Sequence, residues 1–147
     1  MQPFPHVYVV AASGHPAGSL ELSSKGVPRL TAAAPAEFDG PGNEWSPESL
    51  LMASLSSCFL LTFKSVARIA RVEWTQLECS VTGTLERHEG VTQFTKLVTR
   101  ARLKVPNTTL VEACEKALHK AEASCLVANS MRAQRELQIE VIHEGCA

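Results

Sequence analysis

The pattern of apolar and polar residues in the first third of the chain predicts three short strands. A β-branched run covers residues 7–11, polar and apolar residues alternate over 19–23, and a third short strand is expected over 29–33. Turns that contain glycine and proline separate these strands. The loop at 35–45 contains Phe38-Asp39-Gly40-Pro41-Gly42-Asn43, whose glycines and proline preclude regular structure.

The segment after this loop predicts a long and strongly apolar helix. Ser46 can cap it, Pro47 suits the first helical position, and Glu48 complements the positive end of the helix dipole. We expect the helix to run to about Ala70. Apolar side chains occupy most of its circumference, and no charged residue occurs between positions 49 and 63. Such a helix must be buried on most sides, which a chain of 147 residues can hardly achieve alone. The pattern therefore indicates an oligomer.

The second half of the chain predicts a hairpin, a helix and a final strand. Two long alternating segments, 74–87 and 92–105, are joined by residues 88–91 and form an antiparallel hairpin. Thr109-Leu110-Val111-Glu112 has the pattern of a capping box and opens a second helix, which loses its periodicity near residue 124. A last strand follows over 136–143. The order β-β-β-α-β-β-α-β predicts a single α+β domain over residues 1–147.

Composition and charge narrow the class of protein. The chain is 45% hydrophobic and 20% charged, which is enough apolar material for one core. Its formal net charge of −1 argues against binding to nucleic acid or anionic lipid. The N-terminal residues lack the features of a secretory signal, and the most apolar stretch, 49–63, carries four serines and is too short and too polar to span a membrane. We expect a soluble cytoplasmic protein.

The cysteines are the candidates for chemistry. Their number is odd and they form no CxxC pair or His/Cys cluster, which argues against a disulfide framework and against a metal site. Three of them are expected to be core or incidental: Cys79 on a strand, Cys114 on the second helix and Cys146 near the end of the chain. Cys58 differs because it lies in a serine-rich patch of the first helix, and Cys125 because it lies where the second helix ends. These two could form a peroxidatic and resolving pair.

Several of these residues also carry a resemblance to a known family. The loop Phe38-Asp39-Gly40-Pro41-Gly42 leads into Ser46-Pro47-Glu48-Ser49-Leu50-Leu51, Ala53 and Cys58-Phe59 follow on the helix, and the other cysteine lies in Cys125-Leu126-Val127-Ala128-Asn129-Ser130. Through them the chain resembles the OsmC/Ohr family of thiol-dependent hydroperoxide reductases over nearly its whole length. The resemblance implies antiparallel sheets wrapped around two central helices, and two chains intertwined as a homodimer.

The resemblance also implies a mechanism. The thiolate of Cys58 would attack an organic, lipid-like hydroperoxide and become a sulfenic acid, with release of the alcohol. Cys125 would then condense with it to a disulfide, which an external dithiol reductant, lipoyl-type or other, would reopen. No metal, flavin or haem is expected, because sulfur carries the redox chemistry.

A thiolate in the middle of a helix needs a cation, because the helix dipole acts only near the ends. The family supplies an arginine held by the glutamate that corresponds to Glu48. Glu48 and Cys58 are about ten residues apart, ~15 Å along one helix, so Glu48 would serve Cys58 of the other chain. The two positions at which the family carries its arginine hold Glu37 and His15 here. Arg29 lies in the right region and could reach the site from a strand, or it is a solvated strand-end arginine.

Two aromatic residues are candidates for a substrate pocket. Trp45 stands beside the start of the first helix, where it could wall the pocket or staple the helix entry, and Phe59 follows the candidate cysteine. An alternative function follows from the displaced arginine and the apolar helix: a protein on the same scaffold that binds an apolar small molecule at the dimer interface with little turnover. A third interpretation is a structural domain with five buried cysteines.

Overall fold

The computed structural model of the chain describes residues 1–145. Its elements, in chain order, are β1 (Ala11–Ser13), β2 (Leu20–Ser23), β3 (Leu30–Ala32), the 3-10 helix η1 (Ala36–Phe38), α1 (Pro47–Ala70), β4 (Gln76–His88), β5 (Val91–Val105), α2 (Val111–Ser124), α3 (Leu126–Asn129) and β6 (Gln134–His143). The predicted α+β class and the order of strands and long helices are confirmed, with η1 and α3 added. The chain forms two compact units, Met1–Leu51 and a second unit that starts at Met52. Because their boundary falls inside the continuous helix α1, a single domain stays a prediction.

The first unit contains a three-stranded antiparallel sheet in the order β1-β2-β3. The strand predicted over residues 7–11 is wrong for most of its length, since β1 begins only at Ala11. The physical reason is the short partner: β2 covers four residues and pairs with β1 only from Ser23 back to Glu21. The apolar side chains of residues 7–10 are exposed, and Ser24 donates a hydrogen bond to the carbonyl of Val9.

The loop before α1 is shaped by a close approach of backbone to backbone. Asp39 has a φ of 60°, in the left-handed region, and the next residue is Gly40. A Cβ atom on Gly40 would lie 1.7 Å from the carbonyl oxygen of Ala34, so only glycine fits. Ser46 then caps α1 as predicted, because its hydroxyl accepts the N–H of Ser49 at 3.1 Å.

The second unit contains a sheet in the order β4-β5-β6. The predicted hairpin is confirmed: β4 and β5 pair antiparallel along their whole length, with a bulge between Thr84 and Leu85. The final strand corrects the expectation of antiparallel sheets, since β6 runs parallel to β5 from Gln134 to His143. Between β5 and β6 the chain passes through α2 and α3, and such a crossover returns the chain to the same end of the sheet.

The start of α2 corrects the predicted capping box. Leu110 occupies the N-cap position, and no side chain there bonds to the helix. The hydroxyl of Thr109 instead donates to the carbonyl of Glu73 at 3.1 Å. The tertiary contact with the segment after α1 therefore takes the hydroxyl that the local pattern assigned to a cap.

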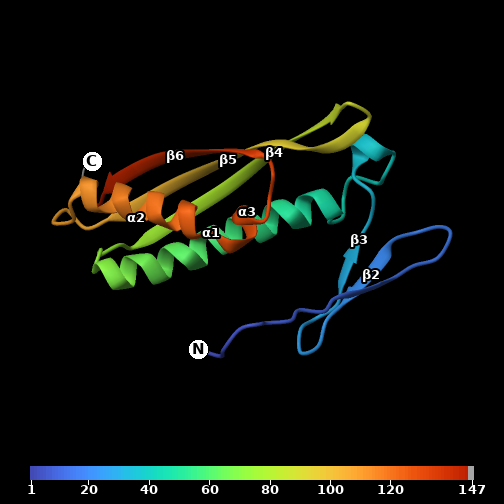
Figure 1. Cartoon of the computed structure of the whole chain (residues 1–147), viewed down its shortest axis with the longest axis horizontal. Helices are drawn as coiled ribbons and strands as arrows, with labels where there is room; N and C mark the ends of the chain where they lie inside the picture. The colour runs from blue at the N-terminus through green and yellow to red at the C-terminus, as the bar shows by residue number, and fades with distance from the viewer. Residues whose placement is uncertain (146–147) are drawn as a thin grey trace. The chain divides into compact units, whose positions relative to one another are not determined.

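The core of the second unit lies between its sheet and its helices. Figure 1 shows α1 and α2 along the same face of the sheet. The buried apolar residues of these two helices and the sheet are Leu55, Phe59, Phe63 and Ala67 of α1, Cys114, Ala117, Leu118 and Ala121 of α2, and Leu77, Leu97, Ala101, Leu103 and Val105 of the sheet. In α1 they repeat every four residues and form a single stripe. The expectation that α1 is buried on most sides is therefore not met by one chain: Leu61 is 61% and Ile69 80% exposed.

By length and apolar composition, α1 also meets the requirements of a membrane-spanning helix, with a mean hydropathy of 1.6. This is weak support for a membrane location, because the core helix of a soluble protein passes the same test. The stripe that packs on the chain's own sheet is what a core helix requires. The hydroxyl groups on other faces of α1, such as those of Ser54, Ser57 and Ser65, suit contact with protein or water better than hydrocarbon.

Candidate functional site

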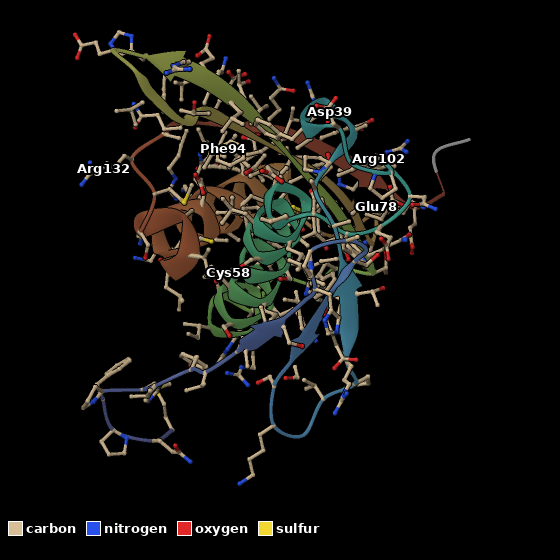
Figure 2. All side chains as sticks on the ribbon, turned by 90° about the vertical axis from the view of Figure 1, so that its right-hand side faces the viewer. Asp39, Cys58, Glu78, Phe94, Arg102 and Arg132 are labelled. Carbon is tan, nitrogen blue, oxygen red and sulfur yellow. The ribbon has the colours of Figure 1, made fainter. Side chains whose placement is uncertain are left out.

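Cys58 lies in the middle of α1, beside a groove of about 520 Å³. Its thiol is half-buried. Figure 2 labels it on the helix. The groove combines hydroxyl groups and carbon surface from two stretches of chain, α1 and the junction of α2 with α3. Its lining consists of Ser54, Ser57, Cys58, Leu61, Thr62 and Ser65 of α1, with Ser124, Leu126 and Val127 opposite. The groove gives a small molecule a route to Cys58.

Cys125 lies at the junction of two helices. It ends α2 and begins α3, and its ψ of 103° breaks the helical path at this one residue. Its N–H donates to the carbonyl of Glu122 at 3.3 Å, and its own carbonyl accepts the N–H of Asn129 at 2.9 Å. The residue is 1% exposed. The break in the helix thus holds a buried thiol at a defined position.

The structure brings the two candidate cysteines together although they are far apart in the sequence. Burial raises the pKa of the Cys125 thiol to about 11, against a weaker opposing hydrogen bond from the N–H of Ala128. A side-chain hydrogen bond with Cys58 and the charge of Glu122 raise this pKa further. Cys125 therefore keeps its proton at neutral pH.

Of the other cysteines, Cys79 on β4 is half-buried and Cys114 on α2 is buried. Burial raises the pKa of Cys79 to about 11, and the charges of Cys125 and Glu122 add to the effect. Burial also raises the pKa of Cys114, which lies in the core as predicted. Cys146, expected to be incidental, lies outside the described residues.

Glu48 is in the first turn of α1, as expected. Its atom Oε2 is buried and has no hydrogen-bond partner among the described residues. A buried carboxylate oxygen without a donor is costly, so this position is suited to receive one. Cys58 lies about ten residues further along the same helix, so the two do not meet through α1 itself.

Arg29 has a different partner from the one that the family pattern suggests. Its guanidinium forms an ion pair of 2.6 Å with Glu21 on the neighbouring strand, and its side chain is 72% exposed. Within the first unit it therefore pairs with Glu21 and not with Glu48. This is the arrangement of a solvated strand-end arginine, the alternative that the sequence left open.

The two aromatic candidates lie in different surroundings. Trp45 is about half exposed, and its backbone forms an isolated β-bridge with Ala32. It lines a separate groove of about 460 Å³ with residues of the preceding loop. Phe59 is 2% exposed and does not line the groove at Cys58. Because successive helical residues point about 100° apart, Phe59 faces the sheet while Cys58 faces the groove. The structure thus assigns Phe59 to the core, which corrects its expected place in the pocket wall.

Sequence reasoning missed a charged pair next to Cys125. Arg135, at the start of β6, donates from Nε to Oε1 of Glu122 at 2.7 Å and from a terminal nitrogen to Oδ1 of Asn129 at 2.7 Å. A second terminal nitrogen donates to the backbone carbonyl of Glu122. Glu122 and Arg135 are 13 positions apart and belong to different elements. No local motif could have indicated this contact.

Within residues 1–145 no three His, Cys, Asp or Glu side chains are placed to hold a metal ion. The absence of a metal cofactor stays a prediction.

Comparison with known proteins gives a consistent result. The sequence model of the family described as OsmC-like protein matches residues 40–140. The uncharacterized protein YmaD of Bacillus subtilis (strain 168) is 26% identical over 109 residues, which are 72% of this chain and 73% of that protein.

Solved structures share the fold. An OsmC-like protein of unknown function from Vibrio cholerae matches with a TM-score of 0.84 at 22% identity, over 92% of this chain and 99% of that one. An organic hydroperoxide resistance protein from Elizabethkingia anophelis matches with a TM-score of 0.77 at 20% identity, over 97% and 100% of the two chains. At these identities the structural matches establish the fold alone.

Proposed function

Because this chain belongs to the OsmC-like family, we propose that it is a cysteine-based peroxidase of the cytoplasm that reduces organic, lipid-like hydroperoxides to alcohols. The observation that carries the proposal is the contact between the groove-lining Cys58 and the buried, protonated Cys125. This is the arrangement that a peroxidatic and a resolving thiol require. A solved structure with the same fold is described as an organic hydroperoxide resistance protein, which supports the choice of substrate.

In the first step the thiolate of Cys58 attacks the distal oxygen of the hydroperoxide. The O–O bond breaks, the sulfur is oxidised to sulfenic acid, and the alkoxide leaves as the alcohol after it takes a proton. Cys125 keeps its proton through this step because burial raises its pKa to about 11. Only one thiol of the pair is therefore a nucleophile toward the peroxide.

In the second step the sulfur of Cys125 attacks the sulfur of the Cys58 sulfenic acid. The S–S bond forms, the S–O bond breaks, and the hydroxide leaves as water with the proton of Cys125. An external dithiol, lipoyl-type or other, returns the disulfide to two thiols. The cycle needs no metal, flavin or haem.

The groove supports the choice of an organic substrate. Leu61, Leu126 and Val127 offer carbon surface to an alkyl group, and the hydroxyl groups of Ser54 and Ser65 can bond to the peroxide oxygens or to water. Hydrogen peroxide has no alkyl group to use this surface. We therefore expect a higher rate with an organic hydroperoxide.

We propose that the active form is a homodimer. The exposed face of α1, which includes Leu61 and Ile69, is too apolar to stay in water, and a second copy would cover it. The unpartnered oxygen of Glu48 would receive a donor from the site of the other chain. The variant Leu61→Asp should then elute as a monomer in size-exclusion chromatography with light scattering, whereas Arg132→Ala, at an exposed position, should leave the dimer intact. Dimeric Leu61→Asp would contradict this interface.

The cation for Cys58 in this scheme is Arg29 of the partner. Its ion pair with Glu21 is exposed, and such pairs contribute only about 0–1 kcal/mol. Arg29 can therefore leave Glu21 and pair with Glu48 at a small cost in free energy. The variant Arg29→Gln should slow the oxidation of Cys58. If it leaves that rate unchanged, Arg29 has no place in the site.

The pairing of Arg29 with Glu21 favours a second candidate function, a protein that binds an apolar small molecule and has little turnover. The rate at which iodoacetamide alkylates Cys58 near neutral pH separates the two. A slow, thiol-like reaction favours binding, and a fast one favours catalysis.

The experiment that tests the peroxidase treats the reduced protein with one equivalent of cumene hydroperoxide and maps the products by mass spectrometry. We expect a Cys58–Cys125 disulfide, formed faster than with hydrogen peroxide. Cys58→Ser should abolish peroxide consumption, and Cys114→Ser, at a buried core thiol, is the matched control that should retain it. Full activity of Cys58→Ser would refute the proposal.

A further inference from the structure

The three contacts of Arg135 surround the residue that carries the second thiol. Its guanidinium bonds to the carboxylate and to the backbone carbonyl of Glu122, before Cys125, and to the side chain of Asn129, after it. The ion pair with Glu122 is largely buried, with a quarter or less of each side chain exposed. A guanidinium is a rigid fork, so three such bonds set the relative positions of the groups that they join.

The backbone of Cys125 is linked to the same two residues. Its N–H bonds to the carbonyl of Glu122, and its carbonyl accepts the N–H of Asn129. Asn129 also donates from Nδ2 to the carbonyl of Ala123 at 3.1 Å. Arg135 therefore closes a bonded ring around the break between α2 and α3. The N-cap of α3, which is Cys125 itself, has no side-chain hydrogen bond, so the bonds of Arg135 and Asn129 are what hold this break in place.

Glu122 and Arg135 also place charged groups near Cys125. The groups that face it are Cys58 of α1, Cys79 of β4, Glu122 of α2 and Arg135 of β6. Glu122 raises the pKa of both Cys125 and Cys79. Its carboxylate thus helps to keep the second thiol protonated, while its bond to Arg135 fixes the chain.

On the basis of the peroxidase function proposed above, we propose that Arg135 and Glu122 are positioning residues that hold Cys125 beside Cys58, so that the disulfide closes as soon as Cys58 has been oxidised. The oxidant in this step is the organic hydroperoxide. A sulfenic acid that is not resolved quickly is oxidised further, so the position of the second thiol protects the first.

The decisive quantity is the effective concentration of the two thiols, measured without any peroxide. The reduced protein is equilibrated in buffers of reduced and oxidised glutathione, and the fraction of Cys58–Cys125 disulfide is read by peptide mapping. Arg135→Ala should lower the effective concentration by about tenfold or more, because the thiol is no longer held in place. Arg132→Ala is the matched control: its side chain points away from the helices (Figure 2), and it should behave as the wild type.

Two further variants separate position from charge. Glu122→Gln keeps an oxygen acceptor for Arg135, so it should largely retain the effective concentration while the pH profile of Cys125 alkylation moves to lower pH. Arg135→Lys keeps the charge but not the fork, and should fall between Arg135→Ala and the wild type. If the role of Glu122 were purely structural, Glu122→Gln would not shift the pH profile of Cys125 alkylation.

The outcomes distinguish this inference from the function on which it rests. A wild-type effective concentration in Arg135→Ala or Arg135→Lys, or an unchanged pH profile in Glu122→Gln, would overturn it. If Arg135→Ala does not fold, as judged by circular dichroism, the other two variants decide. A wild-type protein that forms the disulfide in glutathione but not with cumene hydroperoxide would refute the peroxidase and leave the role of the pair standing.

Discussion

The protonation of Cys125 in the folded protein predicts a large difference between native and unfolded chains. Its pKa is raised from the ordinary value of 9.0 to about 11, chiefly by burial. At pH 8 roughly one thiol in ten ionises at the ordinary pKa, but roughly one in a thousand at the raised one. Since only the thiolate reacts with iodoacetamide, native Cys125 should be alkylated about a hundredfold more slowly than Cys125 in the unfolded chain.

The assay is isotope-coded alkylation with peptide mapping, which reads each cysteine separately. Initial rates are taken in reduced native protein and in guanidinium chloride, from pH 7 to pH 10. In the native protein the alkylation rate at Cys125 should rise about tenfold per pH unit over this range, whereas in the unfolded chain the rise should level off above pH 9. Cys58, which lines the groove, should react first, and the buried Cys114 is the internal control for a slow thiol.

At pH 8, a native rate at Cys125 within tenfold of the unfolded rate would refute this reasoning. It would mean that the thiol is open to solvent and ionised more easily than its surroundings imply. The assignment of Cys58 as the only nucleophile of the pair would then lose its basis.

Three further predictions concern the stability of the second unit. Gly83→Ala should lower the free energy of unfolding by about 1–3 kcal/mol in urea titration, because the new Cβ would lie 2.9 Å from the ring of Phe94 as well as 2.7 Å from the sulfur of Met52; an unchanged midpoint would contradict these contacts. Phe63→Ala, at a fully buried ring, should cost about 3–5 kcal/mol by the same measurement, and a loss below 1 kcal/mol would be inconsistent with its place in the core. Above pH 9 the unfolded chain releases the proton of Cys125 before the folded one, so wild-type stability should fall by up to about 1.4 kcal/mol per pH unit relative to Cys125→Ala, and parallel curves would argue against the raised pKa.

Elements were predicted well where a local sequence pattern meets no competing tertiary contact. The cap and the first turn of α1 lie within four consecutive residues, and the helix runs from Pro47 to Ala70 as its composition indicates. The signals that failed were local patterns overruled by tertiary contacts. Thr109 has the position of a cap but bonds to Glu73, and residues 7–10 have strand composition but no partner strand within residues 1–145.

The candidate site divides in the same way. Cys58 and Cys125 could be selected from the sequence because each cysteine has a distinctive context: Cys58 lies in a serine-rich patch of a helix, and Cys125 lies where a helix ends. What each thiol does depends on quantities that no spacing contains, namely the burial of Cys125 and its neighbours across three elements. Arg135 illustrates the limit: as a residue type it is one arginine among several, and only the return of β6 beside the end of α2 makes it a partner of Glu122. The identity of the two residues as cysteines therefore indicates thiol chemistry, whereas the different roles of the two thiols follow from their surroundings in the fold.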